Sequence, residues 1–122
     1  MYTPKSPKQL ETSMRHVAST IPKVSVIIPN YNHAQYVGAA IQSVLSQTYR
    51  SFEIIVVDDG STDNSRETVA RFGNQVRYIW QENRGLGAAR NTGICAANSE
   101  FIALLDADDQ WQPGYLECML GL

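Results

Sequence analysis

Residues 54–59 read IIVVDD, a run of branched apolar side chains that stops at two carboxylates. A second apolar run, at 101–105, stops in the same way at Asp106, Asp108 and Asp109. Such short runs are typical of strands buried in a parallel sheet, where ligands bind in the crevice at the carboxyl ends of the strands. Both carboxylate groups are therefore expected to face one crevice. A divalent cation is the simplest partner that would offset their mutual repulsion.

Around these two runs, apolar strand-like segments alternate with segments of helical periodicity. We expect strands at 24–28, 52–57, 76–80 and 101–105, and helices at about 37–47, 64–72, 85–98 and from Pro113 onward. Pro29 is expected to end the first strand, because proline cannot donate a ladder hydrogen bond. Ser61 or Asp63 is expected to cap the second helix. The alternation predicts right-handed crossovers and an α/β, Rossmann-like, doubly wound and mostly parallel sheet, truncated after about four strands.

The composition suits one α/β domain, because 43% of the 122 residues are apolar. We expect this domain at 23–122 and a flexible leader at 1–22, where prolines recur without periodicity. A net charge of −2 argues against nucleic acid as a partner. The sequence contains no transmembrane segment or signal peptide, so a cytoplasmic location, including the inner face of the membrane, is expected. Cys95 and Cys118 are expected in helices as reduced, buried thiols.

The aspartates also have simpler interpretations. Asp58 and Asp59 could serve only as turn residues, because Asp-Gly-Ser is common turn chemistry. Three aspartates at 106–109 exceed what capping the last helix needs, and they favour a functional site. In an extended turn, residues two apart point the same way, so of Asp106 and Asp108 one can bind a metal and the other a hydroxyl. Asp109 then points elsewhere or helps to hold the metal.

Gly85 and Gly87 follow a predicted strand and open a predicted helix, as in the dinucleotide-binding fingerprint. Arg90 stands where the fingerprint needs its third glycine, and a bulky side chain there would hold the helix away from the strand. The sequence therefore argues against a dinucleotide site. Arg84 and Arg90 could still pair with a diphosphate, or they could form surface salt bridges.

The aromatic residues and histidines near the strand ends are less informative. Tyr31 could stack on a flat base or pack under the first helix. Trp111 and Tyr115 could form the floor of a sugar pocket, although core packing is favoured. His16 and His33 fit no zinc spacing, and both are interpreted as solvated loop residues.

Five motifs occur in order: VSVIIPNYN at 24–32, SVLSQTY at 43–49, the segment 53–63, NRG at 83–85 with ARNTG at 89–93, and LDADD at 105–109. Their order and spacing resemble those of the family 2 glycosyltransferases of GT-A fold, over about residues 24–120. The resemblance implies a nucleotide-diphosphate sugar as donor, with UDP-sugar favoured, and Mn²⁺ or Mg²⁺ as cofactor.

The resemblance also implies roles for individual residues. Pro29 and Tyr31 would surround the base, Asp59 would accept a hydrogen from it, and Asp106 would meet the ribose. In all, the nucleotide-sugar-binding residues would be Pro29, Tyr31, Asp59, Gly85, Arg90 and Asp106, and the metal ligands would be Asp108 and Asp109.

In the family, an acceptor hydroxyl attacks with inversion, and a general base from a later segment removes its proton. No catalytic residue is therefore expected within this chain, which should bind the donor with little or no transfer by itself. The expected acceptor is saccharide or lipid-linked, as in cell-surface polysaccharide biosynthesis. A truncated sheet also exposes a strand edge, through which self-association is expected.

Two other functions stay open at this point. The chain could be a non-catalytic nucleotide-binding or interaction module. It could also be a receiver-like phosphoacceptor domain, in which aspartates at strand ends surround Mg²⁺. A receiver-like domain needs acidic residues after the first strand, whereas this chain has PNYN at 29–32.

Overall fold

A computed structural model gives the structure of residues 21–122. The leader predicted at 1–22 lies outside the described residues, except for its last two positions. The elements are β1 (Val24–Asn30), α2 (Ala34–Leu45), β2 (Phe52–Asp59), α3 (Ser65–Ala70), the 3₁₀ turn η1 (Gly73–Gln75), β3 (Arg77–Gln81), α4 (Leu86–Ala96), β4 (Phe101–Leu104) and α5 (Tyr115–Met119).

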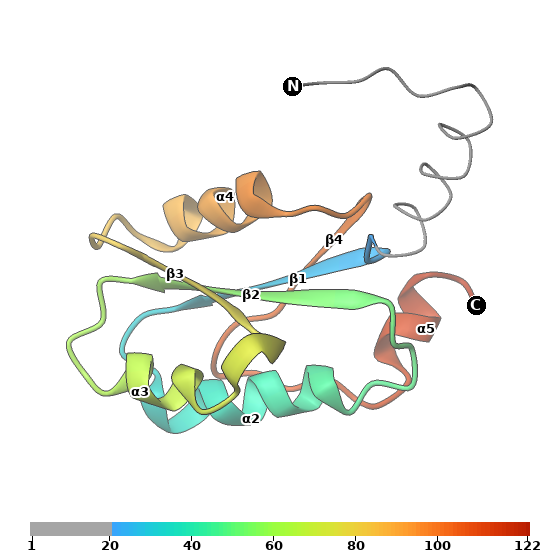
Figure 1. Ribbon diagram of the computed structural model, residues 1–122, viewed down its shortest axis with the longest axis horizontal. Coiled ribbons are helices and arrows are strands. Elements are labelled where there is room, and N and C mark those ends of the chain that lie inside the picture. Colours follow the sequence, from blue (N-terminus) through green and yellow to red (C-terminus); the bar gives the residue numbers. More distant parts are fainter. Residues whose placement is uncertain (1–20) are drawn as a thin grey trace, which may run out of the picture.

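The four strands are all parallel, in the order β3-β2-β1-β4. Helix α4 covers one face of the sheet, and α2, α3 and α5 lie on the other (Figure 1). The chain thus crosses from strand to strand over both faces. The predicted Rossmann-like, doubly wound sheet is confirmed.

Strands β1 and β2 form the centre of the sheet. Because alternate strand residues point to opposite faces, Val26 and Ile28 pack toward α2, while Ile27 packs toward α4. Gly93 of α4 lies directly on this strand, since a Cβ at Gly93 would overlap the Ile27 side chain. Helix α4 therefore packs closely on the sheet, and Gly93 is the point of contact.

Strand β1 is two residues longer than predicted, because Pro29 and Asn30 pair with β2. The Ile27 carbonyl accepts the Leu105 N–H on the β4 side, and strand residues two apart face the same neighbour. The missing N–H of Pro29 therefore falls on the β4 side, where β4 has already ended at Leu104. Proline costs no ladder hydrogen bond at such a position, and the predicted strand end was wrong.

Helix α3 is shorter than predicted and ends at Ala70. Gly73, with φ of +58°, belongs to the following 3₁₀ turn rather than to the end of the helix. The N-cap position is Asn64, which forms no side-chain cap hydrogen bond, so the predicted cap at Ser61 or Asp63 was wrong in position. Asp63, one residue earlier, still satisfies one free amide of the helix, because its Oδ1 accepts the Ser65 N–H at 3.0 Å.

Helix α5 begins at Tyr115, so Pro113 does not lie in its first turn as predicted. The Pro113 carbonyl instead accepts the Thr48 N–H at 2.9 Å, which ties the segment before α5 to the end of α2. Tertiary contact thus delays the start of the helix.

Both cysteines lie in helices as predicted, but both are exposed, so the prediction of buried thiols was wrong. Helix α4 buries Gly93 and helix α5 buries Leu116. Cys95 and Cys118 each follow the buried residue by two positions, which is about 200° around a helix. Their side chains therefore face away from the core.

Strands β3 and β4 are the edges of the sheet within residues 21–122. On β4 the side chains of Phe101, Ile102 and Leu104 are exposed, which agrees with the expected apolar edge. Self-association through this edge stays a prediction. Within the same residues, no helix combines the length and the apolar character that crossing a bilayer requires.

Candidate functional site

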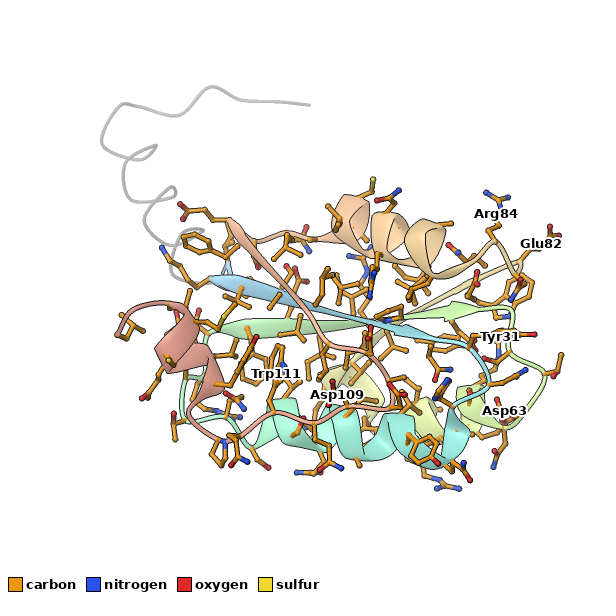
Figure 2. All side chains as sticks on the ribbon, turned by 180° about the vertical axis from the view of Figure 1, so that it is seen from behind. Tyr31, Asp63, Glu82, Arg84, Asp109 and Trp111 are labelled. Carbon is orange, nitrogen blue, oxygen red and sulfur yellow. The ribbon has the colours of Figure 1, made fainter. Side chains whose placement is uncertain are left out.

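A cleft of about 520 Å³ opens at the carboxyl ends of β1, β2 and β4. Its wall combines the β1 end, the β2 end, the start of α4 and the segment after β4: Pro29, Asn30, Tyr31, His33, Asp59, Asn83, Gly85, Leu86, Ala89, Asp106, Ala107 and Asp108. The structure thus brings the two carboxylate groups to one crevice, as the strand pattern predicted. Tyr31 marks this end of the domain in Figure 2.

Asp59 is held at the cleft by a set of hydrogen bonds. Its Oδ1 accepts the Gln81 side-chain Nε2–H at 2.9 Å and the Arg84 backbone N–H at 2.8 Å, and its Oδ2 accepts the Gly85 N–H at 2.9 Å. Burial raises the pKa of Asp59, but these hydrogen bonds and the nearby Arg84 charge outweigh it, so the pKa lies below its usual value. Asp59 is therefore an ionised acceptor, and a carboxylate oxygen with one donor can accept another.

The turn after Asp59 contacts the loop between β3 and α4. The Asn83 side chain donates to the Asp59 carbonyl at 3.1 Å. Gly60 has φ of +76°, and a Cβ there would lie 2.7 Å from the Asn83 backbone nitrogen. Only glycine combines this backbone conformation with so close an approach.

Asp58 has a different role from Asp59, because neighbouring strand residues point to opposite faces. Its Oδ1 accepts the Ser61 N–H at 3.1 Å and its Oδ2 accepts the Tyr78 hydroxyl. Burial raises the pKa of Tyr78, and the hydrogen bond to Asp58 raises it further. Asp58 is 1% exposed and does not belong to the cleft wall, so it holds the turn and β3 in place.

The aspartate side chains of the segment after β4 are more exposed to solvent than those of Asp58 and Asp59. Asp106 forms an ion pair with Arg90 at 3.2 Å, with the two side chains 48% and 36% exposed. Asp108 is exposed and lines the cleft. Asp109 does not line it: its Oδ1 accepts the Gln110 N–H at 3.2 Å (Figure 2).

A metal ion here would have few ligands from the protein. Among residues 21–122, no three His, Cys, Asp or Glu side chains are grouped so as to hold an ion. Mg²⁺ is commonly bound through one or two carboxylates together with substrate phosphates and water. The oxygen ligands of Asp106 and Asp108 suit Mg²⁺ or Mn²⁺ chemically. The residues present therefore fit a cation that arrives with a phosphate-bearing ligand.

Arg90 contacts Asp106, a residue of the cleft wall. Its guanidinium contacts the Asp106 carboxylate, and its Nε is buried without a partner. Arg90 itself is not part of the cleft wall among the described residues. Gly93 rather than residue 90 supplies the close approach of α4 to the sheet, so the dinucleotide fingerprint fails in the structure too.

Gln47 positions the segment that connects the aspartates to α5. Its buried side chain donates to the Ser43 carbonyl at 3.1 Å and to the Gln112 carbonyl at 2.6 Å, and its Oε1 accepts the Leu116 N–H at 3.0 Å. The Trp111 N–H donates to the Ser43 hydroxyl at 3.2 Å. The SVLSQTY motif thus fixes the path from the aspartates to α5.

The aromatic residues separate into two groups. Tyr31 is 47% exposed on the cleft wall, which favours a stacking role over packing under α2. Trp111 and Tyr115 stack at 4.5 Å between ring centroids and pack on the core, so the favoured core-packing interpretation is confirmed.

Sequence reasoning missed other residues of the cleft wall, chiefly Asn30, Asn83 and His33. His33 was predicted to be a solvated loop residue, but it is half-buried and its Nδ1 is buried without a partner. Its position just after a buried strand was the available signal, because residues after strand ends face the crevice. His16 lies outside the described residues.

Comparison with known sequences gives one family. A sequence model of glycosyl transferase family 2 matches residues 25–122. The uncharacterized glycosyltransferase alr2836 of Nostoc sp. is 50% identical over 99 residues, which are 78% of this chain and 31% of that protein. EpsH of Bacillus subtilis, also named as a glycosyltransferase, is 46% identical over 102 residues, or 81% of this chain and 30% of that protein. The chain thus spans about a third of the length of these relatives.

Comparison with solved structures points to the same family as the sequence comparison. S. aureus TarS 1-349 in complex with UDP-GlcNAc has a TM-score of 0.76 and 31% identity, over 81% of this chain and 30% of that chain. The mannosyltransferase PcManGT from Pyrobaculum calidifontis, in complex with GDP-Man and Mn²⁺, has a TM-score of 0.64 and 31% identity, over 75% of this chain and 29% of that chain. These matches to glycosyltransferase structures exclude the receiver-like phosphoacceptor alternative. Since four of the five motifs contribute residues to one cleft on a sheet of GT-A type, and the family match covers nearly all described residues, this chain belongs to glycosyl transferase family 2.

Proposed function

We propose that this domain binds the donor of a glycosyltransferase, a nucleotide-diphosphate sugar, with UDP-sugar favoured, together with Mn²⁺ or Mg²⁺. The observation that carries the proposal is the convergence of Asp59, Asp106 and Asp108 on one cleft. The complexes of similar proteins with UDP-GlcNAc and with GDP-Man and Mn²⁺ support this ligand class.

The base would occupy the part of the cleft near β1 and β2. Tyr31 offers an exposed ring for stacking beside Pro29. Asp59 would accept the N–H of the base, since it is ionised and fixed in position by three donors. One of those donors is the backbone N–H of Gly85, so Gly85 would act by holding Asp59.

The ribose and the diphosphate would lie toward the segment after β4. Asp106 would accept ribose hydroxyls, with Arg90 holding its carboxylate. Asp108 would be the main metal ligand, because it lines the cleft and Asp109 does not. When bound, the cation would neutralise the charge that develops on the departing diphosphate.

Transfer to a saccharide or lipid-linked acceptor would need groups beyond these. We propose inverting transfer, with the general base supplied from outside residues 21–122. Under this proposal the chain as given binds the donor and transfers little or no sugar. Pro29, Tyr31 and Asp59 would bind and orient the nucleotide, and Asp106 and Asp108 would orient the diphosphate end.

Calorimetric titration of the chain with UDP, GDP and CDP, each with and without Mn²⁺, tests the proposal. We expect UDP to bind, and to bind more tightly with Mn²⁺. A matched pair of variants locates the site: Tyr31→Ala should weaken UDP binding about tenfold, as loss of one stacked base does. Trp80→Ala removes an equally exposed aromatic ring outside the cleft wall and should leave binding within about twofold. Failure of all three nucleotides to bind under either condition would refute the proposal.

A further inference from the structure

The charge of the cleft wall is poorly matched to a diphosphate. Three carboxylates line the cleft, from Asp59, Asp106 and Asp108. Arg90 is engaged with Asp106 outside the wall, and Figure 2 shows Arg84 pointing away from the body of the domain. Within the described part of the wall, His33 is the one side chain that can carry positive charge.

His33 is presented to the cleft by a rigid turn. Asn32 adopts φ of +55°, and its Oδ1 accepts the N–H groups of Thr62 at 2.7 Å and Asp63 at 3.3 Å. On the other side of His33, the Ala34 N–H donates to Asp63 Oδ2 at 3.0 Å. The backbone before and after His33 is therefore anchored to the turn that follows β2.

The ring of His33 has hydrogen-bonding capacity that the protein does not use. Nδ1 is buried without a partner, and so is Oδ1 of Asn30, another residue of the cleft wall. Buried polar atoms are nearly always paired, so unpaired ones beside a cleft indicate that a ligand or water completes the site. Nε2 is not among the buried unpaired atoms and has no hydrogen-bond partner within the described residues, so it is the ring nitrogen that is open to a ligand. Tyr36 supports the ring, with centroids 5.9 Å apart.

We propose that His33 contacts the diphosphate of the bound donor, by donating its Nε2 hydrogen to a phosphate oxygen. This inference rests on the proposed function. Within the bound nucleotide sugar, the diphosphate is the part that still needs a hydrogen-bond donor of positive character from the protein. The base and the ribose already have partners in Tyr31, Asp59 and Asp106. An imidazole N–H donating to an anionic oxygen forms a charge-assisted hydrogen bond, which is about twice as strong as a neutral one. His33 would thus complement the metal on a wall that is otherwise acidic.

Titration of His33→Ala with uridine, UMP and UDP, in Mn²⁺, tests this contact. We expect UDP affinity to fall about tenfold and uridine affinity to stay within about twofold, since uridine has no phosphate. His33→Lys should retain more UDP affinity than His33→Ala, because lysine again supplies an N–H donor to the phosphate. Gln35→Ala is the matched control: Gln35 is exposed in the same turn of α2, lies outside the cleft wall, and should bind UDP like the wild type.

An equal loss for uridine and UDP would overturn the inference, since it would mean that His33 only shapes the wall. Unchanged UDP affinity in His33→Ala would also overturn it. Thermal melts establish that the variants fold, and if His33→Ala does not, the ratio of UDP to uridine affinity in His33→Asn decides the question. Failure of the proposed function looks different, because the wild type itself would then bind none of UDP, GDP and CDP, with or without Mn²⁺.

Discussion

Asp59 is 3% exposed and accepts three hydrogen bonds, whereas the side chain of Asp106 is 48% exposed and has one ion-pair contact, with Arg90. The β2 end of the cleft is therefore held in place by the protein itself. The segment after β4 is anchored through its backbone and Gln47, but its carboxylates remain accessible.

This difference shows how one cleft can divide recognition between rigid and open parts. A preorganised acceptor reduces the free energy lost on ordering a ligand, which suits the recognition of a flat base. Exposed carboxylates keep their hydration until a cation and phosphates replace it, which suits a metal that binds together with its substrate. We expect substitution of Asp59, on the rigid side, to weaken nucleotide binding with and without metal, and substitution of Asp108, on the open side, to weaken chiefly metal-dependent binding.

The largest effect is expected from Asp59→Ala, which should weaken UDP binding about 100-fold. It removes the acceptor for the base and leaves the N–H groups of Arg84 and Gly85 without their partner. Asp59→Asn keeps the shape and one acceptor oxygen, so a loss of about tenfold is expected. Calorimetry measures both values. Equal affinities of Asp59→Ala and the wild type would show that the rigid side does not recognise the base.

A smaller effect is expected from Gly60→Ala, which should lower the free energy of unfolding by about 2 kcal/mol and weaken UDP binding severalfold. Its Cβ would strike the Asn83 backbone at a residue with positive φ, so the loop that holds Asp59 must move. Gly87→Ala is the control, because a Cβ there meets nothing within 4 Å among the described atoms and the position is helical. Urea unfolding should show Gly87→Ala to be as stable as the wild type or more so, and the reverse ranking would contradict this prediction.

On the open side, Asp108→Ala and Asp109→Ala should differ. Asp108→Ala should reduce the gain in UDP affinity from Mn²⁺ about tenfold, while Asp109→Ala should change it less than about threefold, because Asp109 lies outside the cleft wall. Titration of UDP at several Mn²⁺ concentrations distinguishes the effects of the two substitutions. A larger effect at Asp109 would mean that this segment rearranges when the metal binds.

The smallest effect concerns acid stability on the rigid side. Burial raises the pKa of Asp63, but hydrogen bonds from the Ser65 hydroxyl and from the Ala34 and Ser65 N–H groups outweigh it, so the pKa is lowered. A carboxyl with a lowered folded pKa stabilises the fold fully above its unfolded pKa of about 4, and this contribution is lost as the pH falls through the folded pKa. Asp63→Asn should therefore lose less stability than the wild type below about pH 4. Urea unfolding at pH 6 and pH 3 measures the difference, and identical acid slopes would contradict it.

The strand ends show how far a linear pattern reaches. Apolar runs that stop at aspartates were enough to predict a parallel sheet and a shared crevice, since burial requires the runs and parallel strands end together. They could not separate Asp58 from Asp59, because both extend one run and the side facing the cleft depends on sheet register. The apolar runs also could not reveal the ion pair between Arg90 and Asp106, because this pair depends on how α4 crosses the sheet.

Periodicity also predicted helices better than their ends or surroundings. Cys95 and Cys118 were assigned to helices correctly, yet their exposure depended on which side of each helix met the core. Pro113 lies before the helix and its carbonyl accepts the Thr48 N–H, although proline locally favours the first turn of a helix.

By itself, the sequence determined the family, the order of the elements and the two strand ends whose carboxylates meet at the crevice, because these follow from residue type, spacing and local burial. Only the tertiary structure decided that Asp59 lines the cleft while Asp58 does not, which arginine is already paired, and that His33 belongs to the wall. Those outcomes depend on register and helix placement, which are set by contacts between residues far apart in the chain.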